Sequence, residues 1–133
     1  MSTTNTDMAR RLIAAFDTSD ESVLEELIHP QHRDHGPDEE GVGRDAVRES
    51  MRWVSATFGD RDTEIEDLFA TDDRVVARVR FAATQIGELP SGLAPTHRRF
   101  ETEHIHIWRV ADGQLAEHWM LRDDLGALRQ LQA

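Results

Sequence analysis

The sequence predicts an α+β fold: a curved, cone-shaped sheet, antiparallel or mixed, with N-terminal helices packed on its concave face. Two observations lead to this expectation. In the first 58 residues and at the end of the chain, apolar residues recur every three to four positions. Between residues 63 and 122 they tend to alternate with polar ones. The first spacing is typical of amphipathic helices and the second of strands. Helices that precede a run of strands indicate an α+β arrangement with a cavity between the two layers.

Length and charge limit the classes of protein that this chain can represent. Its 133 residues suit a single domain, 1–133, with disorder expected over about residues 1–5. A net charge of −11 argues against nucleic acid and anionic membrane surfaces as partners. No stretch approaches the roughly 20 apolar residues of a membrane span, and the first residues lack the pattern of a signal peptide. We therefore expect a cytoplasmic protein.

Helix signals dominate the first half of the chain. We expect a first helix from an N-cap at Thr6 to about Asp17 and a short second helix, capped by Asp20, that ends at about Ile28. A loop is predicted over His32–Gly43, because this segment is polar and rich in glycine. A third helix is predicted over Arg44–Phe58.

Strand signals dominate the second half. We expect strands over Thr63–Ala70 and Val75–Ile86, then a loop over Glu88–His97. A hairpin follows, with strands Arg99–Val110 and Gln114–Arg122. A last helix, capped by Asp124, completes the chain; the predicted order is α-α-α-β-β-β-β-α.

The hairpin carries three of the seven histidines. Because side chains alternate along a strand, one face of the first strand carries His104, His106 and Trp108. One face of the second carries His118 and Met120, together with Arg122. We expect both faces of this sheet to be covered, one by the core and the other by a cavity.

Three absent residue types narrow the chemistry. There is no cysteine, no lysine and no tyrosine. These absences exclude a thiol nucleophile, a Schiff-base lysine and a tyrosine oxyanion donor. Acid–base chemistry is then left chiefly to histidine and carboxylate side chains.

The motifs of residues 8–131 resemble those of SnoaL-like polyketide cyclases, members of the nuclear transport factor 2-like superfamily. The resemblance rests on Ile28-His29-Pro30, Trp53–Phe58, Pro95-Thr96, Arg98, Phe100, His106, Arg109, Asp112-Gly113, Glu117-His118, Asp123, Gly126 and Leu128–Leu131. It implies a cone-shaped fold, often dimeric, around a hydrophobic pocket. It also implies an intramolecular aldol condensation without metal or organic cofactor. In this sequence the family histidine falls on His106, the family asparagine on Asp34 and the catalytic aspartate on Met120.

The candidate site follows from the strand faces and the resemblance together. The candidate catalytic residues are Asp34, His35, His106 and His118. The candidate substrate-binding residues are Phe16, Met51, Trp53, His104, Trp108 and Met120. We expect desolvation in an apolar cavity to raise the pKa of Asp34, as suits a base. No metal is expected, although His104, His106 and His118 could supply three ligands.

Three functions agree with these residues. The leading hypothesis is a cofactor-independent cyclase or isomerase that acts on a small hydrophobic, polyketide-like molecule, with a homodimer as its assembly. The second is a non-catalytic small-molecule-binding or interaction module, because Met120 cannot transfer a proton. The third is an epoxide hydrolase-like site that combines Asp34 with Arg78 or Arg80.

Overall fold

The computed structural model describes residues 4–36 and 40–133. Within these residues six strands form one mixed sheet in the order β2-β1-β6-β5-β4-β3. The elements are α1 (Asn5–Thr18), a 3₁₀ turn (Glu21–Val23), α2 (Leu24–Leu27), β1 (Ile28–His35), β2 (Glu40–Val42), α3 (Gly43–Thr57), β3 (Phe58–Ala70), β4 (Arg74–Gln85), β5 (Arg99–Ala111), β6 (Gln114–Arg122) and α4 (Asp124–Leu131). No helix in the described part of the chain is long and apolar enough to cross a membrane.

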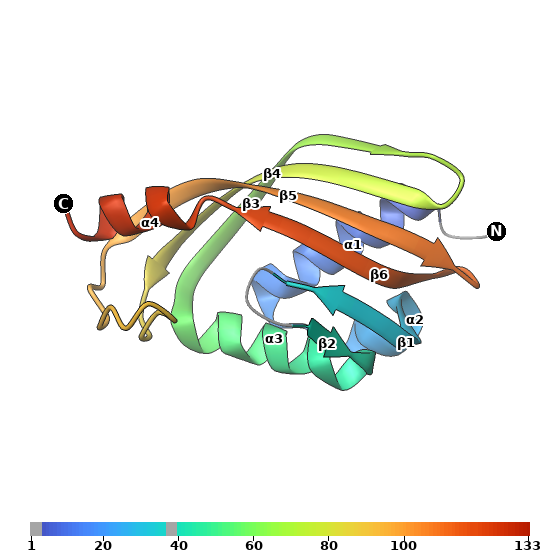
Figure 1. Ribbon diagram of the computed structural model, residues 1–133, viewed down its shortest axis with the longest axis horizontal. Helices are drawn as coiled ribbons and strands as arrows, with labels where there is room; N and C mark the ends of the chain where they lie inside the picture. The colour runs from blue at the N-terminus through green and yellow to red at the C-terminus, as the bar shows by residue number, and fades with distance from the viewer. Residues whose placement is uncertain (1–3, 37–39) are drawn as a thin grey trace.

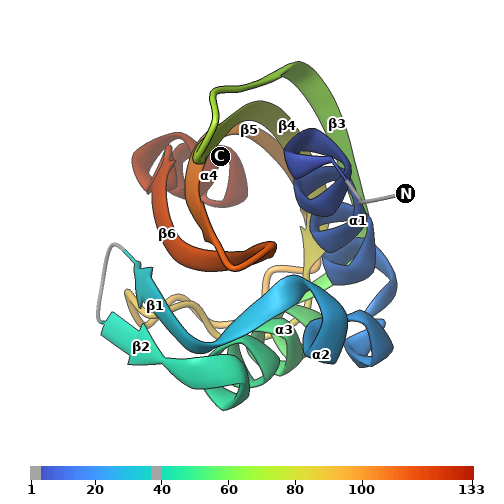
Figure 2. The ribbon, with the colours of Figure 1, turned by 90° about the vertical axis from the view of Figure 1, so that its right-hand side faces the viewer.

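The sheet curls around an interior that helices close. Figure 1 shows long, bent strands with α1 and α3 on the concave side, and Figure 2 shows the sheet curving from β3 to β2 around them. Apolar side chains from α1 and α2 fill one end of this interior against β4 and β5, with Met8, Leu12 and Leu24 at most 5 % exposed. The α+β fold and the N-terminal helices on the concave face are therefore as the sequence predicts.

Helix α1 begins earlier than expected. The hydroxyl of Thr4, not that of Thr6, accepts a hydrogen bond from the amide of Asp7, and Asn5 already belongs to the helix. Of the five residues expected to be disordered, Thr4 and Asn5 are thus ordered, while 1–3 lie outside the described residues. The helix ends at Thr18, and its C-cap Ser19 has a φ of 58°, which breaks the helical geometry.

The predicted loop His32–Gly43 is wrong over most of its length. It contains the second half of β1 and all of β2, while residues 37–39 lie outside the described part. Ile28, the expected end of the second helix, instead begins β1. The inward positions of β1 include His32, whose Nδ1 bonds the Leu115 carbonyl. The polar residues of β1 pair with β6, which is distant along the chain, so the local sequence does not reveal this strand.

The antiparallel part of the sheet follows its predicted pattern closely. Strand β6 spans the predicted residues, β5 extends one residue further, and β4 begins and ends one residue earlier than predicted. The β5–β6 turn has positive φ at Asp112 (53°) and Gly113 (72°), as a type I′ hairpin requires. Strand β3 starts at Phe58, five residues before the predicted Thr63, and its irregular first part includes a register shift between Gly59 and Asp62.

The expectation that both faces of the sheet are covered is wrong for the convex face. The concave face supplies both the core and the cavity wall. On the convex face Leu121 is 73 % exposed, Phe69 57 % and Ile105 41 %. Arg78 and Arg80 also lie there, and pair with acidic residues of β3 and β5.

The N-cap of α4 gives a direct test of the local structure. The carboxylate of Asp123, not that of Asp124, accepts the amide of Gly126 at 2.8 Å. We predict that Asp123→Ala lowers the free energy of unfolding by about 1 kcal/mol. Asp124→Ala, which removes an exposed partner of Arg122, lowers it by no more than about 0.5 kcal/mol. Urea denaturation measures both values, and equal losses would contradict this capping assignment.

Candidate active site

A cavity of about 680 Å³ lies between the concave face of the sheet and helices α1 and α3. Its wall includes eight of the ten residues that the sequence singles out: Phe16, Asp34, Trp53, His104, His106, Trp108, His118 and Met120. It is mainly apolar; the histidines and Asp34 gather on β1, β5 and β6, and Asp17, Glu40 and Glu49 also line it. A buried apolar space with a few converging polar groups is the usual form of a small-molecule site.

A second cavity of about 370 Å³ continues from the first beneath α4 and the segment before β5. The two share six lining residues: Trp53, Phe58, Phe81, Pro90, His104 and Arg122. His104 and Arg122 face each other across the β5–β6 pair and mark this boundary. Together the two cavities are lined from the histidines of β5 to the C-terminal helix α4.

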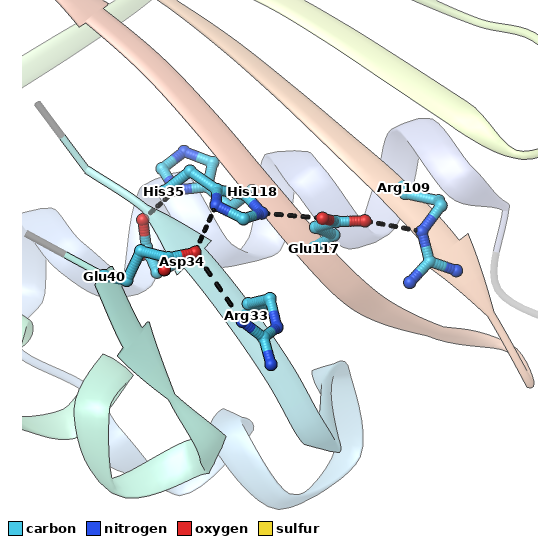
Figure 3. Close-up of polar contacts among 7 residues, drawn as sticks. All are labelled: Arg33, Asp34, His35, Glu40, Arg109, Glu117 and His118. Carbon is cyan, nitrogen blue, oxygen red and sulfur yellow. Dashed lines mark hydrogen bonds and ion pairs between the residues drawn. The ribbon is translucent and has the colours of Figure 1, made fainter.

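Asp34, His118 and His106 form a continuous hydrogen-bonded chain along the cavity wall. Nδ1 of His118 lies 3.0 Å from Oδ1 of Asp34, and Nε2 of His118 lies 2.9 Å from Nδ1 of His106. Figure 3 shows the first of these contacts, between β1 and β6. The alternation of β1, β5 and β6 turns all three side chains to the concave face.

These contacts fix the tautomers of both imidazoles in their neutral forms. A carboxylate only accepts, so Nδ1 of His118 carries the hydrogen and its Nε2 is an acceptor. Nδ1 of His106 must then donate to His118, which leaves a lone pair on Nε2 of His106. No hydrogen bond within the described residues uses this nitrogen. The chain therefore presents a basic nitrogen at the cavity wall.

Aromatic packing holds this nitrogen in place. The His106 ring stacks on Trp108 and on His118, with both centroid distances 5.1 Å. Trp108 and His118 also stack, at 5.0 Å. Three flat rings in mutual contact restrict ring rotation, and so keep Nε2 of His106 directed as the hydrogen bonds require.

Burial and neighbouring groups shift the pKa values of both His106 and Asp34. Burial, together with the nearby His118 and His104 rings, lowers the pKa of His106 well below its ordinary value. For Asp34, burial alone raises the pKa, but the hydrogen bond from His118 and the electrostatic attraction of nearby imidazole rings outweigh it, so the net shift is downward. The expected rise in the pKa of Asp34 is therefore wrong. Asp34 stays an anion and anchors His118.

His104 provides a further neutral imidazole in the cavity. Burial and the charge of Arg122 lower the pKa of His104 to about 4. Its ring stacks on Phe81 at 5.1 Å, and its Nε2 has a long contact of 3.4 Å with the hydroxyl of Thr102. His104 is thus uncharged at neutral pH and can donate a hydrogen bond to a ligand oxygen from one of its ring nitrogens.

Two predicted site residues lie elsewhere. His35 points to the convex face, where it stacks on Trp119, because consecutive residues of β1 face opposite sides. Met51 is only 1 % exposed and packs in the core, because part of the apolar stripe of α3 faces the core rather than the cavity. Neither belongs to the cavity wall.

The epoxide hydrolase-like arrangement is not formed, because Arg78 and Arg80 lie on the face opposite Asp34 and pair with carboxylates there. Among the described residues no group of three or more His, Asp or Glu side chains is arranged to hold a metal ion.

The cavity residues that were missed as candidates include His32 and Arg122. His32 lies two positions before Asp34 on β1, so recognition of this strand would have placed it on the same face. Arg122 was assigned to the face of His118 and Met120 by strand alternation, but was not singled out. Both could have been found by extending the strand pattern.

Comparison with known proteins identifies the class to which this fold and site belong. A family model described as SnoaL-like polyketide cyclase matches residues 6–131. The chain belongs to this family, and its relatives support a cyclase-like enzyme.

The individual relatives agree with this assignment. Nogalonic acid methyl ester cyclase of Streptomyces nogalater is 32 % identical over 90 % of this chain and 91 % of its own. Aklanonic acid methyl ester cyclase of Streptomyces sp. (strain C5) is 30 % identical over 94 % and 80 %. Among solved structures, TsrD from Streptomyces laurentii has a TM-score of 0.84 and 30 % identity, covering 97 % of this chain and 98 % of its own.

The depressed pKa of His104 predicts a loss of stability in acid. The unfolded chain binds a proton at His104 near pH 6.5, whereas the folded protein binds it only near pH 4. Stability is therefore fully present above about pH 6.5 and falls as the pH drops toward 4, by up to about 3 kcal/mol from this residue. His104→Gln should flatten the fall.

Urea denaturation at pH 7, 5.5 and 4.5 measures this effect. His97→Asn, at an exposed position outside both cavities, is the matched control and should keep the wild-type slope. A His104→Gln protein that loses stability as steeply as wild type would contradict the assignment.

Proposed function

We propose that this chain catalyses an intramolecular, aldol-type ring closure or a related proton-transfer isomerisation, without a cofactor, on a flat polyketide-derived molecule. The observation that carries the proposal is the chain Asp34–His118–His106, which leaves the lone pair of His106 Nε2 at the wall of an apolar cavity. Family membership and the names of the relatives support the reaction class.

In the proposed reaction, Nε2 of His106 removes a proton from a carbon next to a substrate carbonyl. The resulting enolate carbon attacks a second carbonyl of the same molecule, which forms the new carbon–carbon bond and an alkoxide. The proton then returns from His106 Nε2 to the alkoxide oxygen. No electrons are gained or lost overall, and His106 ends in its starting state.

His118 and Asp34 make His106 a better base than its burial alone would allow. A positive charge on the buried His106 ring is costly, as its lowered pKa reflects. When Nε2 accepts a proton, Nδ1 can pass its own proton 2.9 Å to His118. The charge then rests on His118, next to the Asp34 carboxylate at 3.0 Å.

His104 and Arg122 are placed to receive the substrate oxygen on which negative charge develops. Both lie on the concave face, two residues along their strands from His106 and Met120. A neutral imidazole can stabilise an enolate by donating a hydrogen bond, without the cost of a buried cation. The aromatic wall formed by Phe16, Trp53 and Trp108 suits the flat faces of a multi-ring substrate.

We also propose that the protein acts as a homodimer joined through the convex face. An apolar row crosses this face from Phe69 through Val76 and Ile107 to Trp119, according to the strand register. Leu121, 73 % exposed, lies beside it. Exposed apolar surface of this kind is typical of protein interfaces. Light scattering in solution would give twice the chain mass for a dimer.

The alternative function is a non-catalytic binding module. Its support is Met120, which stands where the resemblance puts the catalytic aspartate and lies directly opposite His106 on β6. A thioether cannot transfer a proton, and it adds apolar surface to the cavity. In this alternative the protein binds the same class of ligand but does not catalyse a reaction on it.

Substitution of the hydrogen-bonded chain tests the proposal. We predict that His106→Gln lowers kcat about 10²–10⁴-fold. Asp34→Asn should lower it by about 10²-fold or more, because an amide can donate to Nδ1 of His118 and reverse the tautomer. Turnover of aklanonic and nogalonic acid methyl esters, followed by chromatography, measures both effects. His97→Asn should match wild type, and the proposal fails if His106→Gln and Asp34→Asn do as well.

The substitution Met120→Asp separates the two functions. If His106 is the base, the wild-type protein is active and the added carboxylate changes kcat by less than about 10-fold. If the protein only binds, the wild type is inactive and the variant gains cyclase activity. The same turnover assay, applied to wild type and variant in parallel, distinguishes these results.

A further inference from the structure

Strand β1 carries the carboxylate of the proposed site, yet no tight turn fixes its register with β6, its parallel neighbour in the sheet. It pairs in parallel with β6, which places Asp34 opposite His118, and this ladder contains a register shift between Ile28 and Arg33. In a hairpin the turn fixes the register, but these strands are far apart in the chain. Side-chain contacts must therefore contribute to the alignment of Asp34 with His118.

Such contacts are present on the convex face, directly behind Asp34. Nε2 of His35 lies 2.6 Å from Oε2 of Glu117 on β6, and its Nδ1 lies 2.9 Å from Oε1 of Glu40 on β2. The other oxygen of Glu117 accepts Nε of Arg109 at 2.8 Å. Figure 3 shows this network beside the Asp34–His118 contact. His35 thus joins three adjacent strands, its own and both neighbours.

The ring of His35 is held in a single orientation. The hydrogen bond from Arg109, with a further one from His35, keeps the pKa of Glu117 below its usual value, so Glu117 is an anion. Carboxylates that only accept thus lie against both ring nitrogens of His35. The ring also stacks on Trp119 at 5.1 Å and 18°, with Arg74 placed 5.7 Å over the same indole.

We propose that His35 is a positioning residue: by bridging Glu117 and Glu40 it holds β1 in register with β6, and so keeps Asp34 against His118. The proposal rests on the proposed role of the Asp34–His118–His106 chain. His35 acts from the opposite face of the sheet and touches neither the cavity nor the reacting atoms. It makes no bond to His118. It selects the tautomer of His118 by fixing the position of β1, and with it that of Asp34.

The alignment of β1 with β6 matters because a hydrogen bond forms only over a short range of distances. Asp34 follows Arg33 and precedes His35, so a shift of β1 at either neighbour moves the carboxylate as well. The Asp34–His118 contact of 3.0 Å would weaken with a shift of even part of an ångström. His118 would then lose the acceptor that selects its Nδ1–H form. Misplacement of a catalytic group by about 1 Å can cost about 10²-fold in rate.

Substitution of His35 tests the proposal with two measurements, of which the first, an NMR spectrum, needs no substrate. His35→Leu removes both donors and keeps an apolar contact with Trp119. We expect long-range ¹H–¹⁵N spectra to show His118 mainly as the Nδ1–H form in wild type, and as a mixture of tautomers in His35→Leu. On a substrate that wild type turns over, kcat should fall about 10²-fold, while KM changes less than about threefold.

Two further variants complete the design. His35→Arg supplies two donors to Glu117 and Glu40, and should restore the wild-type spectrum and kcat. His29→Leu removes another β1 histidine that is paired with a carboxylate, Asp112 at 3.0 Å, and should leave both readings unchanged. Thermal melts of each variant exclude global unfolding as the cause.

The proposal is overturned if His118 keeps its wild-type spectrum in His35→Leu, or if His29→Leu disturbs it as strongly. Because the spectra need no turnover, they decide the role of His35 even if the protein has no activity on the tested esters. A failure of the proposed function is thereby distinguishable from a failure of this inference.

Discussion

The parallel contact between β1 and β6 is the interaction on which the cavity and its polar groups depend. The other neighbouring strands in the sheet are antiparallel, and β3 to β6 follow one another along the chain. Among the described residues, the β1–β6 ladder is the only strand pairing that joins the N-terminal strands to this meander. It completes the curl of the sheet, and it places the Asp34 carboxylate against His118 at the wall of the interior.

This contact resolves an electrostatic conflict in the site. A cavity apolar enough to hold a multi-ring molecule disfavours charged imidazoles, and burial lowers the pKa of both His104 and His106. The carboxylate of Asp34 remains ionised because His118 donates to it. In the proposed reaction, the positive charge that forms when His106 accepts a proton can then move to His118, whose counter-ion is Asp34. The methionine at the family's aspartate position is compatible with this scheme, since the carboxylate reaches the site from β1.

The sequence predicted those parts of the fold whose pattern is local. Alternation in the hairpin placed His104, His106 and His118 on the correct face, because the type I′ turn and the side-chain period of a strand act over a few residues. It did not reveal β1, whose inward positions include His32 and Asp34 rather than aliphatic residues. Asp34 was reached through the resemblance instead, and the segment around it was expected to be a loop.

The errors at the site have the same origin. The direction of the pKa shift of Asp34 depends on His118, which lies 84 residues away along the chain. His35 was assigned to the cavity because a loop has no alternating faces, whereas a strand turns it to the opposite side. Met51 shares a helical stripe with cavity residues, and the stripe alone does not distinguish core from cavity. In each case a long-range contact decided what local spacing could not.

The most direct test of this account is the tautomeric state of His106 and His118 in the wild-type protein near neutral pH. Long-range ¹H–¹⁵N correlation spectra of the imidazole rings report which nitrogen of each carries the hydrogen. The account predicts a hydrogen on Nδ1 and a bare Nε2 in both neutral rings, with Nε2 of His106 open to the cavity. A hydrogen on Nε2 of His118 and a bare Nδ1 would contradict it, because His118 would then donate to His106 and have nothing to donate to Asp34.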